Sequence, residues 1–284
     1  LVTGGLAAIG LYYLLDEEDG CSDPSLSLSR SASRVNENAG TATITATLDS
    51  VLATNLTIPL TPTGTATSGF DYATVSSITI TAGALTGTTT FTASDDIQYE
   101  SSTDETAIFT INNVVGTCIN INSVTIAIND DDSAPTITLT SSQSSIAENA
   151  GTSINLTAIL SSPTYEAVTV ALTPTGTATE GTDYGTITDI TISAGSTLGT
   201  ASFTPTNDTM YETATAETAV VAVTNVSGGA ATESGTQSVS LSITADSDAA
   251  PTATLATSAS TVTESGSDLT LTATLSNPTH ETVT

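Results

Sequence analysis

The chain has 284 residues, of which 30 are acidic and two are basic, so its formal net charge at pH 7 is −28. This balance argues against nucleic acid and anionic membrane surfaces as partners, because both bind through Lys and Arg, and it favours multivalent cations. Only 11% of the residues are charged and 38% are hydrophobic, which predicts a folded chain, and the abundance of Thr, Ser, Val and Ile predicts an almost purely β fold.

Residues 1–15 form an apolar run that stops against Asp16-Glu17-Glu18-Asp19. The run is shorter than the roughly 20 residues that span a bilayer. Its interpretation stays open between the core of a signal peptide, the end of a membrane anchor that begins upstream, and a segment buried in a neighbouring subunit. A lipid-modified Cys21 is disfavoured, since Asp19 and Gly20 precede it. We expect residues 1–24 to be an apolar N-terminal segment with an acidic linker.

From Ser25 onward the chain consists of short alternating segments broken by Gly, Pro, Asn and Asp, which is typical of an antiparallel sandwich. The period of two residues predicts which side chains face the core. In the later part of the chain these are Ile154, Leu156, Ala158, Leu160, Val168, Val170, Leu172, Ala219, Val221, Val223, Val239, Leu241 and Ile243. In the earlier part they are Ala107, Phe109, Ile111, Val124, Ile126 and Ile128.

A comparison of the chain with itself reveals an internal repeat. The segment Thr61-Pro62-Thr63-Gly64-Thr65-Ala66-Thr67, followed by Gly69, Asp71 and Tyr72, recurs 112 residues later as Thr173-Pro174-Thr175-Gly176-Thr177-Ala178-Thr179, followed by Gly181, Asp183 and Tyr184. Glu37-Asn38-Ala39-Gly40 recurs as Glu148-Asn149-Ala150-Gly151, and more loosely as Glu264-Ser265-Gly266. The sequence therefore predicts three copies of one module.

Acidic runs that are followed by a proline mark the junctions between the copies. Asp130-Asp131-Asp132 precedes Pro135, and Asp246 with Asp248 precedes Pro251. We expect a first repeat at 25–135, a second at 136–251 and a partial third at 252–284. The third copy holds only the first two or three strands, and half a sandwich cannot bury its inner face. Either the natural protein continues or a neighbour completes this copy.

Carboxylates return at fixed places in both complete repeats. The spacing from Asp96 to Glu100 to Glu105 equals that from Asp208 to Glu212 to Glu217, which is unexpected for a face that is merely solvated. The set of the first repeat is Glu37, Asp71, Asp96, Glu100, Glu105, Asp130, Asp131 and Asp132. The set of the second repeat is Glu148, Asp183, Asp208, Glu212, Glu217, Asp246 and Asp248.

The arrangement resembles the Calx-beta domain, an immunoglobulin-like repeat of sodium/calcium exchangers and of many large bacterial surface proteins. The matching elements are the Glu37-Asn38-Ala39-Gly40 entry, the segment that ends at Asp71-Tyr72, the Asp96 to Glu100 element and the terminal acidic cluster, in this order and in two copies. The resemblance implies tandem immunoglobulin-like antiparallel sandwiches. It also implies that the two carboxylate sets are calcium ligands.

Electrostatics supports this expectation independently. Two carboxylates about 5 Å apart repel by roughly 3 kcal/mol at an effective dielectric near 20, and the only side chains with a fixed positive charge are Arg30 and Arg34. A hard divalent ion with six to eight oxygen ligands can neutralise such a cluster. The alternative is that the acids only keep a secreted surface soluble. This alternative weighs more for the second repeat, where Asn207 and Ser247 replace the acids at Asp95 and Asp131.

The two cysteines bear on the cellular compartment. Cys21 precedes the first strand, and Cys118 lies in the turn between the last two strands of the first repeat. If the last strand ends at the acidic pole, that turn lies at the opposite pole, where the first strand starts. A Cys21–Cys118 disulfide is therefore expected, against the alternatives of two free thiols or an intermolecular bridge, and its loop of about 100 residues corresponds to about 4 to 5 kcal/mol in the chain-entropy model.

Catalysis finds no support in the sequence. His280 is the single histidine, no Ser-His-Asp set can be assembled, and the paired acids belong to a repeated element. Two functional hypotheses follow. The first is a secreted or cell-surface array of calcium-stiffened sandwiches that serves as a fibre, stalk or adhesin and self-associates through residues 1–15. The second is a calcium-dependent ligand-binding or calcium-sensing module of a larger membrane-anchored protein.

Overall fold

A computed structural model describes residues 23–284 except 101–102, 113, 213–214, 247 and 280–281. The predicted apolar segment 1–15, Cys21 and His280 thus lie outside the described residues. Contacts divide the chain into two compact units. Unit 1 comprises residues 23–95 and 104–129, and unit 2 comprises residues 96–103 and 130–284. Within the described ranges, no helix has both the length and the apolar character needed to cross a membrane.

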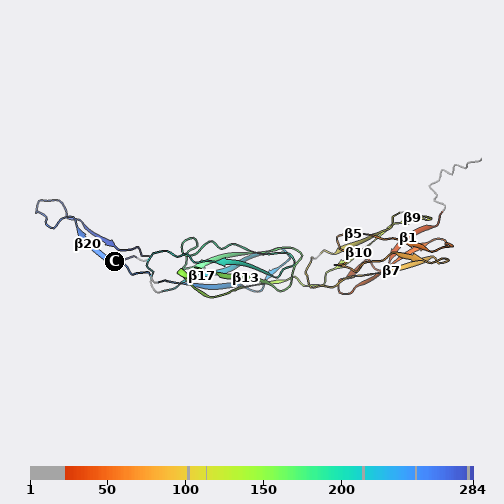
Figure 1. The fold of residues 1–284 in the computed structure, drawn as a ribbon, viewed down its shortest axis with the longest axis horizontal. Coiled ribbons are helices and arrows are strands. Elements are labelled where there is room, and N and C mark those ends of the chain that lie inside the picture. The colour runs from red at the N-terminus through yellow and green to blue at the C-terminus, as the bar shows by residue number, and fades with distance from the viewer. Residues whose placement is uncertain (1–22, 101–102, 113, 213–214, 247, 280–281) are drawn as a thin grey trace, which may run out of the picture. The chain divides into compact units, whose positions relative to one another are not determined.

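Unit 1 is a sandwich of two four-stranded sheets with an additional strand pair, counted over its described residues. Figure 1 shows β1 and β9 of one sheet and β5 and β10 of the other. The first sheet has the order β7 (Thr86–Thr92), β3 (Thr41–Leu48), β1 (Ser25–Arg30) and β9 (Cys118–Ile121). The second has the order β2 (Arg34–Asn36), β10 (Ser123–Asn129), β8 (Glu105–Thr110) and β5 (Thr61–Gly64), and β4 (Leu56–Ile58) pairs with β6 (Ile78–Ile80).

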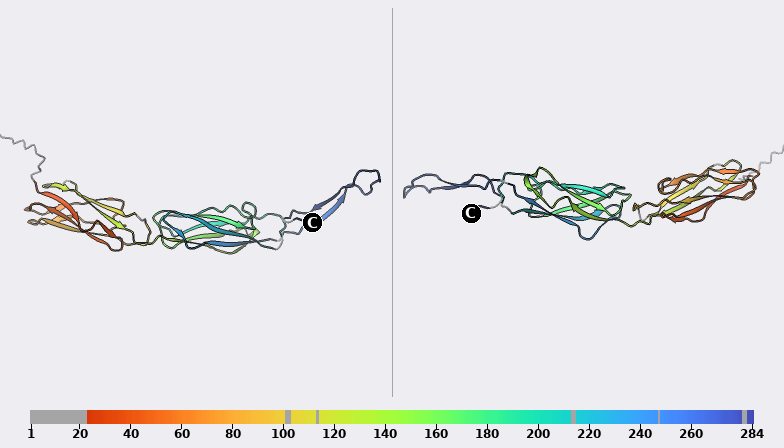
Figure 2. Two further views of the ribbon diagram at one scale, coloured as in Figure 1. Left: turned by 180° about the vertical axis from the view of Figure 1, so that it is seen from behind. Right: turned by 60° about the horizontal axis from the view of Figure 1, so that its bottom comes forward.

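Unit 2 repeats this architecture in its described residues, and Figure 2 shows its strands from two further sides. One sheet has the order β16 (Leu198–Phe203), β13 (Ile154–Leu160), β11 (Thr136–Ser141) and β18 (Thr232–Glu233). The other has the order β12 (Ser145–Ala147), β19 (Ser238–Thr244), β17 (Glu217–Ser227), β14 (Val168–Gly176) and β15 (Ile190–Ile192). A 3-10 turn, η1 (Glu148–Ala150), follows β12 directly. The predicted all-β fold of immunoglobulin-like sandwiches is confirmed.

The first extended segment of each sandwich changes sheets, which is a departure from purely antiparallel pairing. β1 pairs antiparallel with β3, whereas β2 pairs parallel with β10 in the opposite sheet. β11 and β12 repeat this switch, because β11 pairs with β13 and β12 pairs parallel with β19. The switch carries the chain to the end of the second sheet just before Glu37 and Glu148.

The two cores contain the predicted side chains. All the residues expected to face the core are buried, apart from the partly buried Val239, which packs against the same cluster. Tyr72 and Tyr184 are each only 2% exposed. The ring of Tyr72 lies 5.1 Å from that of Phe91, and the ring of Tyr184 lies 4.7 Å from that of Phe203, measured between centroids. The repeated tyrosine therefore anchors its loop in the core.

The third copy is represented by a hairpin of β20 (Ala253–Thr257) and β21 (Leu271–Leu275). Its register pairs Ala253 with Leu275 and Leu255 with Ala273, as β11 pairs Ile137 with Leu160 and Leu139 with Ala158. Every residue of both strands is exposed, including Leu255 at 70%. The equivalent faces of β1 and β11 are buried, so the aliphatic pattern of the hairpin matches a core-facing strand pair.

The boundaries of the units differ from the predicted repeat boundaries at one loop. Residues 96–103 belong to the first repeat in sequence but to unit 2 by contacts. Within unit 2, the Tyr99 amide donates a hydrogen bond to the Pro163 carbonyl, and the Tyr165 amide donates one to the Tyr99 carbonyl, both at 3.0 Å. The predicted domains at 25–135, 136–251 and 252–284 stay a prediction.

Candidate metal centre

The glutamate of the Glu-Asn-Ala-Gly motif is carried to the end of the sandwich by the strand that changes sheets. The Glu37 amide donates to the Asn129 carbonyl at 2.9 Å, since β2 and β10 run in parallel with Asn36 opposite Asn129. Glu37 is 4% exposed and its counterpart Glu148 is 5% exposed. Two carboxyl groups that lie this deep need a partner of opposite charge or several hydrogen bonds.

The aspartate of the Gly-x-Asp-Tyr motif is positioned by a tight turn. The carboxylate of Asp71 accepts the Thr67 amide at 2.5 Å, and that of Asp183 accepts the Thr179 amide at 2.6 Å. The neighbouring Gly69 and Gly181 have φ of +90° and +85°, a conformation that suits glycine. With Tyr72 and Tyr184 fixed in the cores, the turn presents Asp71 and Asp183 at the same place in each sandwich.

Three predicted residues of the second repeat form a compact group inside unit 2. One carboxylate oxygen from each of Asp183, Glu212 and Glu217 lies within 4.8 Å of the others. The pKa of Glu212 is raised to about 7, first by burial and then by the charges of Glu148, Glu217, Asp208 and Asp183. Burial and the neighbouring carboxylates therefore both disfavour the ionised form of Glu212.

The other carboxylates of the second repeat lie around Glu148. Its Oε1 accepts the Asp208 amide at 2.8 Å. Burial is the main cause that raises the pKa of Glu148, and the charges of Asp208, Asp246 and Asp248 add to it, while the hydrogen bond from the Asp208 backbone lowers it. Asp246 closes its own turn, because its Oδ1 accepts the Asp248 amide at 2.9 Å. The seven predicted carboxylates of the second repeat are therefore connected through Glu148 and Glu212, each of which is influenced by several of the others.

Some of these contacts recur in the first repeat, where each unit contains part of the predicted set. In unit 1, carboxylate oxygens of Asp71 and Glu105 lie within 4.8 Å of one another, and the pKa of Glu105 is raised to about 7 by burial and by Asp71. In unit 2, the Glu100 amide donates to Asp130 Oδ2 at 2.9 Å, and the Asp132 amide donates to Asp130 Oδ1 at 2.8 Å.

Two residues of the predicted set occupy more peripheral positions. Asp96 is exposed and its Oδ1 accepts the Gln98 amide at 2.6 Å, as Asp208 accepts the Met210 amide at 2.6 Å. Asp131 is exposed, and it belongs to none of the three-carboxylate groups found among the described residues. Asp96 and Asp131 thus serve the turn and the charge of the region, while the other members supply the closely spaced oxygens.

The donor set fits a hard divalent cation. It consists of carboxylate oxygens, which Ca²⁺ prefers. Among the described residues, Glu105 Oε2 and Asp248 Oδ2 are buried without a hydrogen-bond partner. No Lys or Arg follows Arg34 in the sequence, so the second repeat has no fixed side-chain cation that could compensate for its carboxylates. Such uncompensated buried oxygens are costly unless an ion or water satisfies them.

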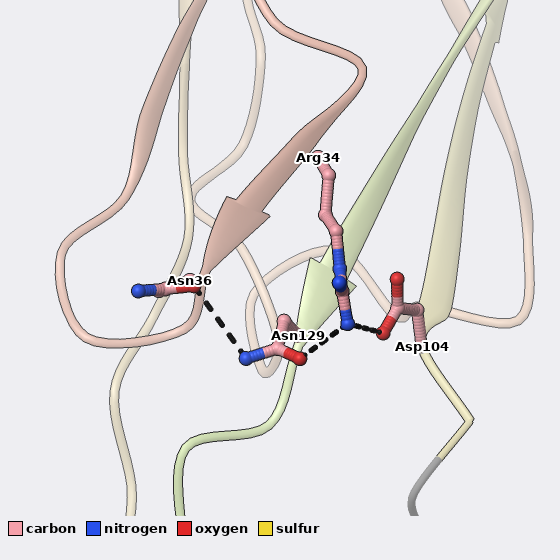
Figure 3. A network of polar contacts seen from close by, with 4 residues as sticks. All are labelled: Arg34, Asn36, Asp104 and Asn129. Carbon is pink, nitrogen blue, oxygen red and sulfur yellow. Dashed lines mark hydrogen bonds and ion pairs between the residues drawn. The ribbon is translucent and has the colours of Figure 1, made fainter.

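A polar network beside the acidic residues of the first repeat was missed by the sequence reasoning. Arg34 Nη2 donates to Asp104 Oδ1 at 2.6 Å and to Asn129 Oδ1, and Asn129 Nδ2 donates to Asn36 Oδ1 (Figure 3). The available signal was the position of Arg34, because one of only two basic residues stands three positions before Glu37.

Cys118 lies at the pole that the sequence predicted, although it begins the short strand β9 rather than a turn. β9 runs parallel to β1 with Cys118 opposite Ser25, and the Cys118 amide donates to the Pro24 carbonyl at 2.9 Å. The start of the first strand and Cys118 are thus neighbours. Because Cys21 lies outside the described residues, the Cys21–Cys118 disulfide stays a prediction.

Sheet switching, paired cores and acidic turns that recur with the sequence period define a tandem array of immunoglobulin-like sandwich modules. The Calx-beta domain model matches residues 19–127 and 130–265. The chain therefore belongs to the Calx-beta family, and the resemblance stated from the motifs is confirmed. The family consists of non-catalytic domains. A comparison with curated protein sequences found no relative.

Solved structures with a similar fold include CBD12 from CALX1.2, with 14% identity over 77% of this chain and 99% of that one, at a TM-score of 0.35. The calcium binding domain CBD12 of CALX1.1 has 16% identity, covering 68% and 77%, at 0.31. Invasin, a bacterial integrin-binding protein, has 18% identity, covering 87% and 45%, at 0.40.

Proposed function

We propose that this chain is a calcium-binding array of Calx-beta repeats from a secreted or cell-surface protein. The observation that carries the proposal is the group of Asp183, Glu212 and Glu217, whose carboxylate oxygens lie within 4.8 Å of one another. The three negative charges repel one another, which destabilises the ion-free site. A bound Ca²⁺ ion attracts all three carboxylates and so removes this repulsion. In the first repeat, the sequence period assigns the same role to Asp71, Glu100 and Glu105.

The remaining predicted carboxylates complete the proposed ligand sets. In the second repeat, Glu148, Asp208, Asp246 and Asp248 supply further charge and oxygen atoms. In the first repeat, the corresponding residues are Glu37, Asp96, Asp130, Asp131 and Asp132. When bound, calcium would supply the positive charge that these residues lack. The chain's own residues would hold the turns that follow β10 and β19 in one conformation, which stiffens the array.

Calcium-dependent thermal stability tests the proposal on the whole chain. An ion present at 100 times its dissociation constant stabilises the folded state by about 2.7 kcal/mol, which raises the melting temperature of a module of this size by several degrees. Magnesium and extra sodium chloride at matched ionic strength are the controls for screening. Calorimetry that shows equal shifts with calcium and with these salts would contradict the proposal.

The two repeats can be ranked by removing one equivalent aspartate from each. Asp130 accepts hydrogen bonds from the amides of Glu100 and Asp132, and it belongs to a run of three acids. Asp246 accepts the Asp248 amide, and its neighbour Ser247 is neutral. We expect Asp130→Ala to lower the calcium-dependent rise in melting temperature more than Asp246→Ala does.

The state of assembly of the protein distinguishes the two functional hypotheses, a structural array and a recognition module. We propose that the array serves as a fibre, stalk or adhesin and that residues 1–15 mediate self-association. Electron microscopy of native material that shows regular filaments would support this assignment. Monodisperse protein that retains a saturable calcium-dependent ligand would support the ligand-binding or sensing alternative instead.

A further inference from the structure

The network around Arg34 joins the ends of three strands of one sheet. Arg34 lies on β2, Asn129 ends β10, and Asp104 directly precedes β8. The guanidinium donates to Asp104 at 2.6 Å, and it also donates to Asn129, which reaches Asn36 at 3.5 Å (Figure 3). The ion pair is partly solvated, with side-chain exposures of 57% for Arg34 and 26% for Asp104.

The three other residues of the network each stand directly before a residue of the proposed calcium site in the sequence. Asn36 precedes Glu37, Asp104 precedes Glu105, and Asn129 precedes Asp130. The register confirms that these strand ends are adjacent, since Asn36 lies opposite Asn129 and Ile128 lies opposite Glu105. A contact that fixes the three strand ends therefore also fixes the points from which the three carboxylates project.

The second repeat lacks the four residues of the network while it keeps seven of the eight predicted carboxylates. Strand pairing and the sequence period identify the equivalent positions. Arg34, Asn36, Asp104 and Asn129 correspond to Ser145, Ala147, Ala216 and Thr244. All four polar partners are replaced together, which is expected if they act as one unit. The chain thus contains its own natural comparison between an acidic end with a resident cation and one without.

We propose that Arg34 is a positioning residue and a built-in counter-ion for the calcium site of the first repeat. The inference rests on the proposed calcium binding and adds a difference between the repeats in how the acidic end is stabilised. With no calcium bound, Arg34 compensates for Asp104 and ties the strand ends together, so the first repeat keeps its acidic end in place at low calcium. The second repeat relies on the ion itself.

The direction of the effects follows from charge. Replacing Arg34 alone leaves Asp104 uncompensated beside carboxylates that already repel one another. The calcium-free protein therefore loses stability, whereas the more negative site attracts calcium more strongly. Both effects are electrostatic at a solvated position, so they shrink in high salt. A residue with a purely structural role would lower the stability without raising the affinity for calcium.

The test uses the full chain, with the backbone amide signals of Ala107 and Ala219 as separate reporters for the two repeats. These alanines are both fully buried and stand two positions after Glu105 and Glu217. Calcium titrations give the affinity at each reporter. Urea titrations of calcium-depleted protein give the stability at each reporter. If the Ala107 amide signal of the wild type did not change during the calcium titration, the proposed function itself would be refuted before any variant is compared.

Arg34→Ser is expected to tighten calcium binding about two- to fivefold at Ala107 and to lower the calcium-free urea midpoint there by about 0.1 to 0.5 M. Ala219 should not respond. Adding Asp104→Ala to Arg34→Ser should bring the affinity back to within about twofold of wild type, because the uncompensated charge is gone. Arg34→Lys retains the charge and should keep the wild-type affinity.

The reverse experiment installs the pair in the second repeat. Ser145→Arg together with Ala216→Asp should raise the calcium-free midpoint at Ala219. An Arg34→Ser variant with unchanged calcium affinity at Ala107 would overturn the inference, whatever its stability, provided that the wild type binds calcium there. An Arg34→Lys variant that behaves like Arg34→Ser would overturn the assignment of charge as the cause.

Discussion

The acidic ends of the two complete repeats share seven carboxylate positions, yet only one of them has a side-chain cation. Asp71 and Asp183 accept equivalent amides, and so do Asp130 and Asp246. The polar network around Arg34 has no counterpart in the second repeat, where Ser145 and Ala216 take the places of the ion pair. The comparison distinguishes the carboxylates, which form the acidic site, from the Arg34 network, which stabilises the site while it holds no ion.

If both repeats bind calcium as proposed, this difference would make them respond at different calcium concentrations. A site with a resident cation has a smaller repulsion to relieve, so the ion gains less by binding. A site without one is more costly to fold empty and gains more from the ion. Neighbouring repeats of nearly the same architecture can therefore differ in calcium dependence through substitutions that do not touch the ligands.

The largest expected effect tests the part that both repeats share. Tyr72→Ala and Tyr184→Ala each remove a buried ring that holds the aspartate turn against the core, and each should lower the free energy of unfolding by about 3 to 5 kcal/mol. Urea denaturation of the calcium-free protein measures the loss. Tyr72→Phe and Tyr184→Phe are the matched controls that keep the ring. A loss below about 1 kcal/mol in either alanine variant would show that the turn is anchored elsewhere.

The next effect concerns a proposed ligand, and its sign depends on calcium. Glu212→Gln removes a charge from a group in which burial and four neighbouring carboxylates raise the pKa to about 7. Without calcium the variant should therefore melt at a higher temperature than the wild type. With calcium it should bind at least about tenfold more weakly, a loss comparable to that seen when a supporting group of a metal site is removed. Isothermal titration calorimetry measures the calcium affinity, and differential scanning calorimetry measures the melting temperature without calcium.

Glu166→Gln provides a control for the general effect of charge, because Glu166 lies in the second repeat outside the predicted ligand set. It should leave the calcium affinity within about twofold of the wild type. If Glu212→Gln destabilised the calcium-free protein, the carboxylate would be making favourable contacts and the repulsion argument would be wrong.

Most of the fold was predictable from the sequence because it depends on patterns that repeat. The alternation at Ile154, Leu156 and Ala158 identified core faces without knowledge of their partners. The change of sheets between β1 and β2 was not predicted, because a linker of three residues, Ser31-Ala32-Ser33, is too short to show a period. The Arg34 network was missed for a related reason, since hydrogen bonds among Arg34, Asp104 and Asn129 join positions far apart in the chain.

The pH dependence tests the repulsion in both repeats at once. Burial, followed by neighbouring carboxylates, raises the pKa of Glu105 and of Glu212 to about 7 in the metal-free protein. A carboxyl group whose pKa is higher in the folded state binds its proton more readily when folded. Stability should therefore increase as the pH falls from about 8 to about 5.5.

Differential scanning calorimetry in calcium-depleted buffer checks this direction, and saturating calcium should reduce the rise because the ion competes with protons for the same oxygens. A melting temperature that falls over this range without calcium would contradict it. Glu105→Gln and Glu212→Gln should each remove part of the rise, which assigns it to the repeats separately.

The smallest expected effect shows where the Arg34 network ends. Asn36 is exposed and accepts a hydrogen bond from Asn129 at 3.5 Å, a long and therefore weak bond. Asn36→Ala, which installs the residue found at Ala147, should change the free energy of unfolding by less than about 0.5 kcal/mol and leave the calcium affinity of the first repeat unchanged. At the Ala107 reporter, a urea titration measures the free energy of unfolding and a calcium titration measures the affinity. If Asn36→Ala lowered the free energy of unfolding as much as Arg34→Ser does, a cooperative chain of hydrogen bonds would hold the three strand ends. Charge alone would then not account for the difference between the repeats. A negligible loss would localise the difference to Arg34 and its two direct partners, Asp104 and Asn129.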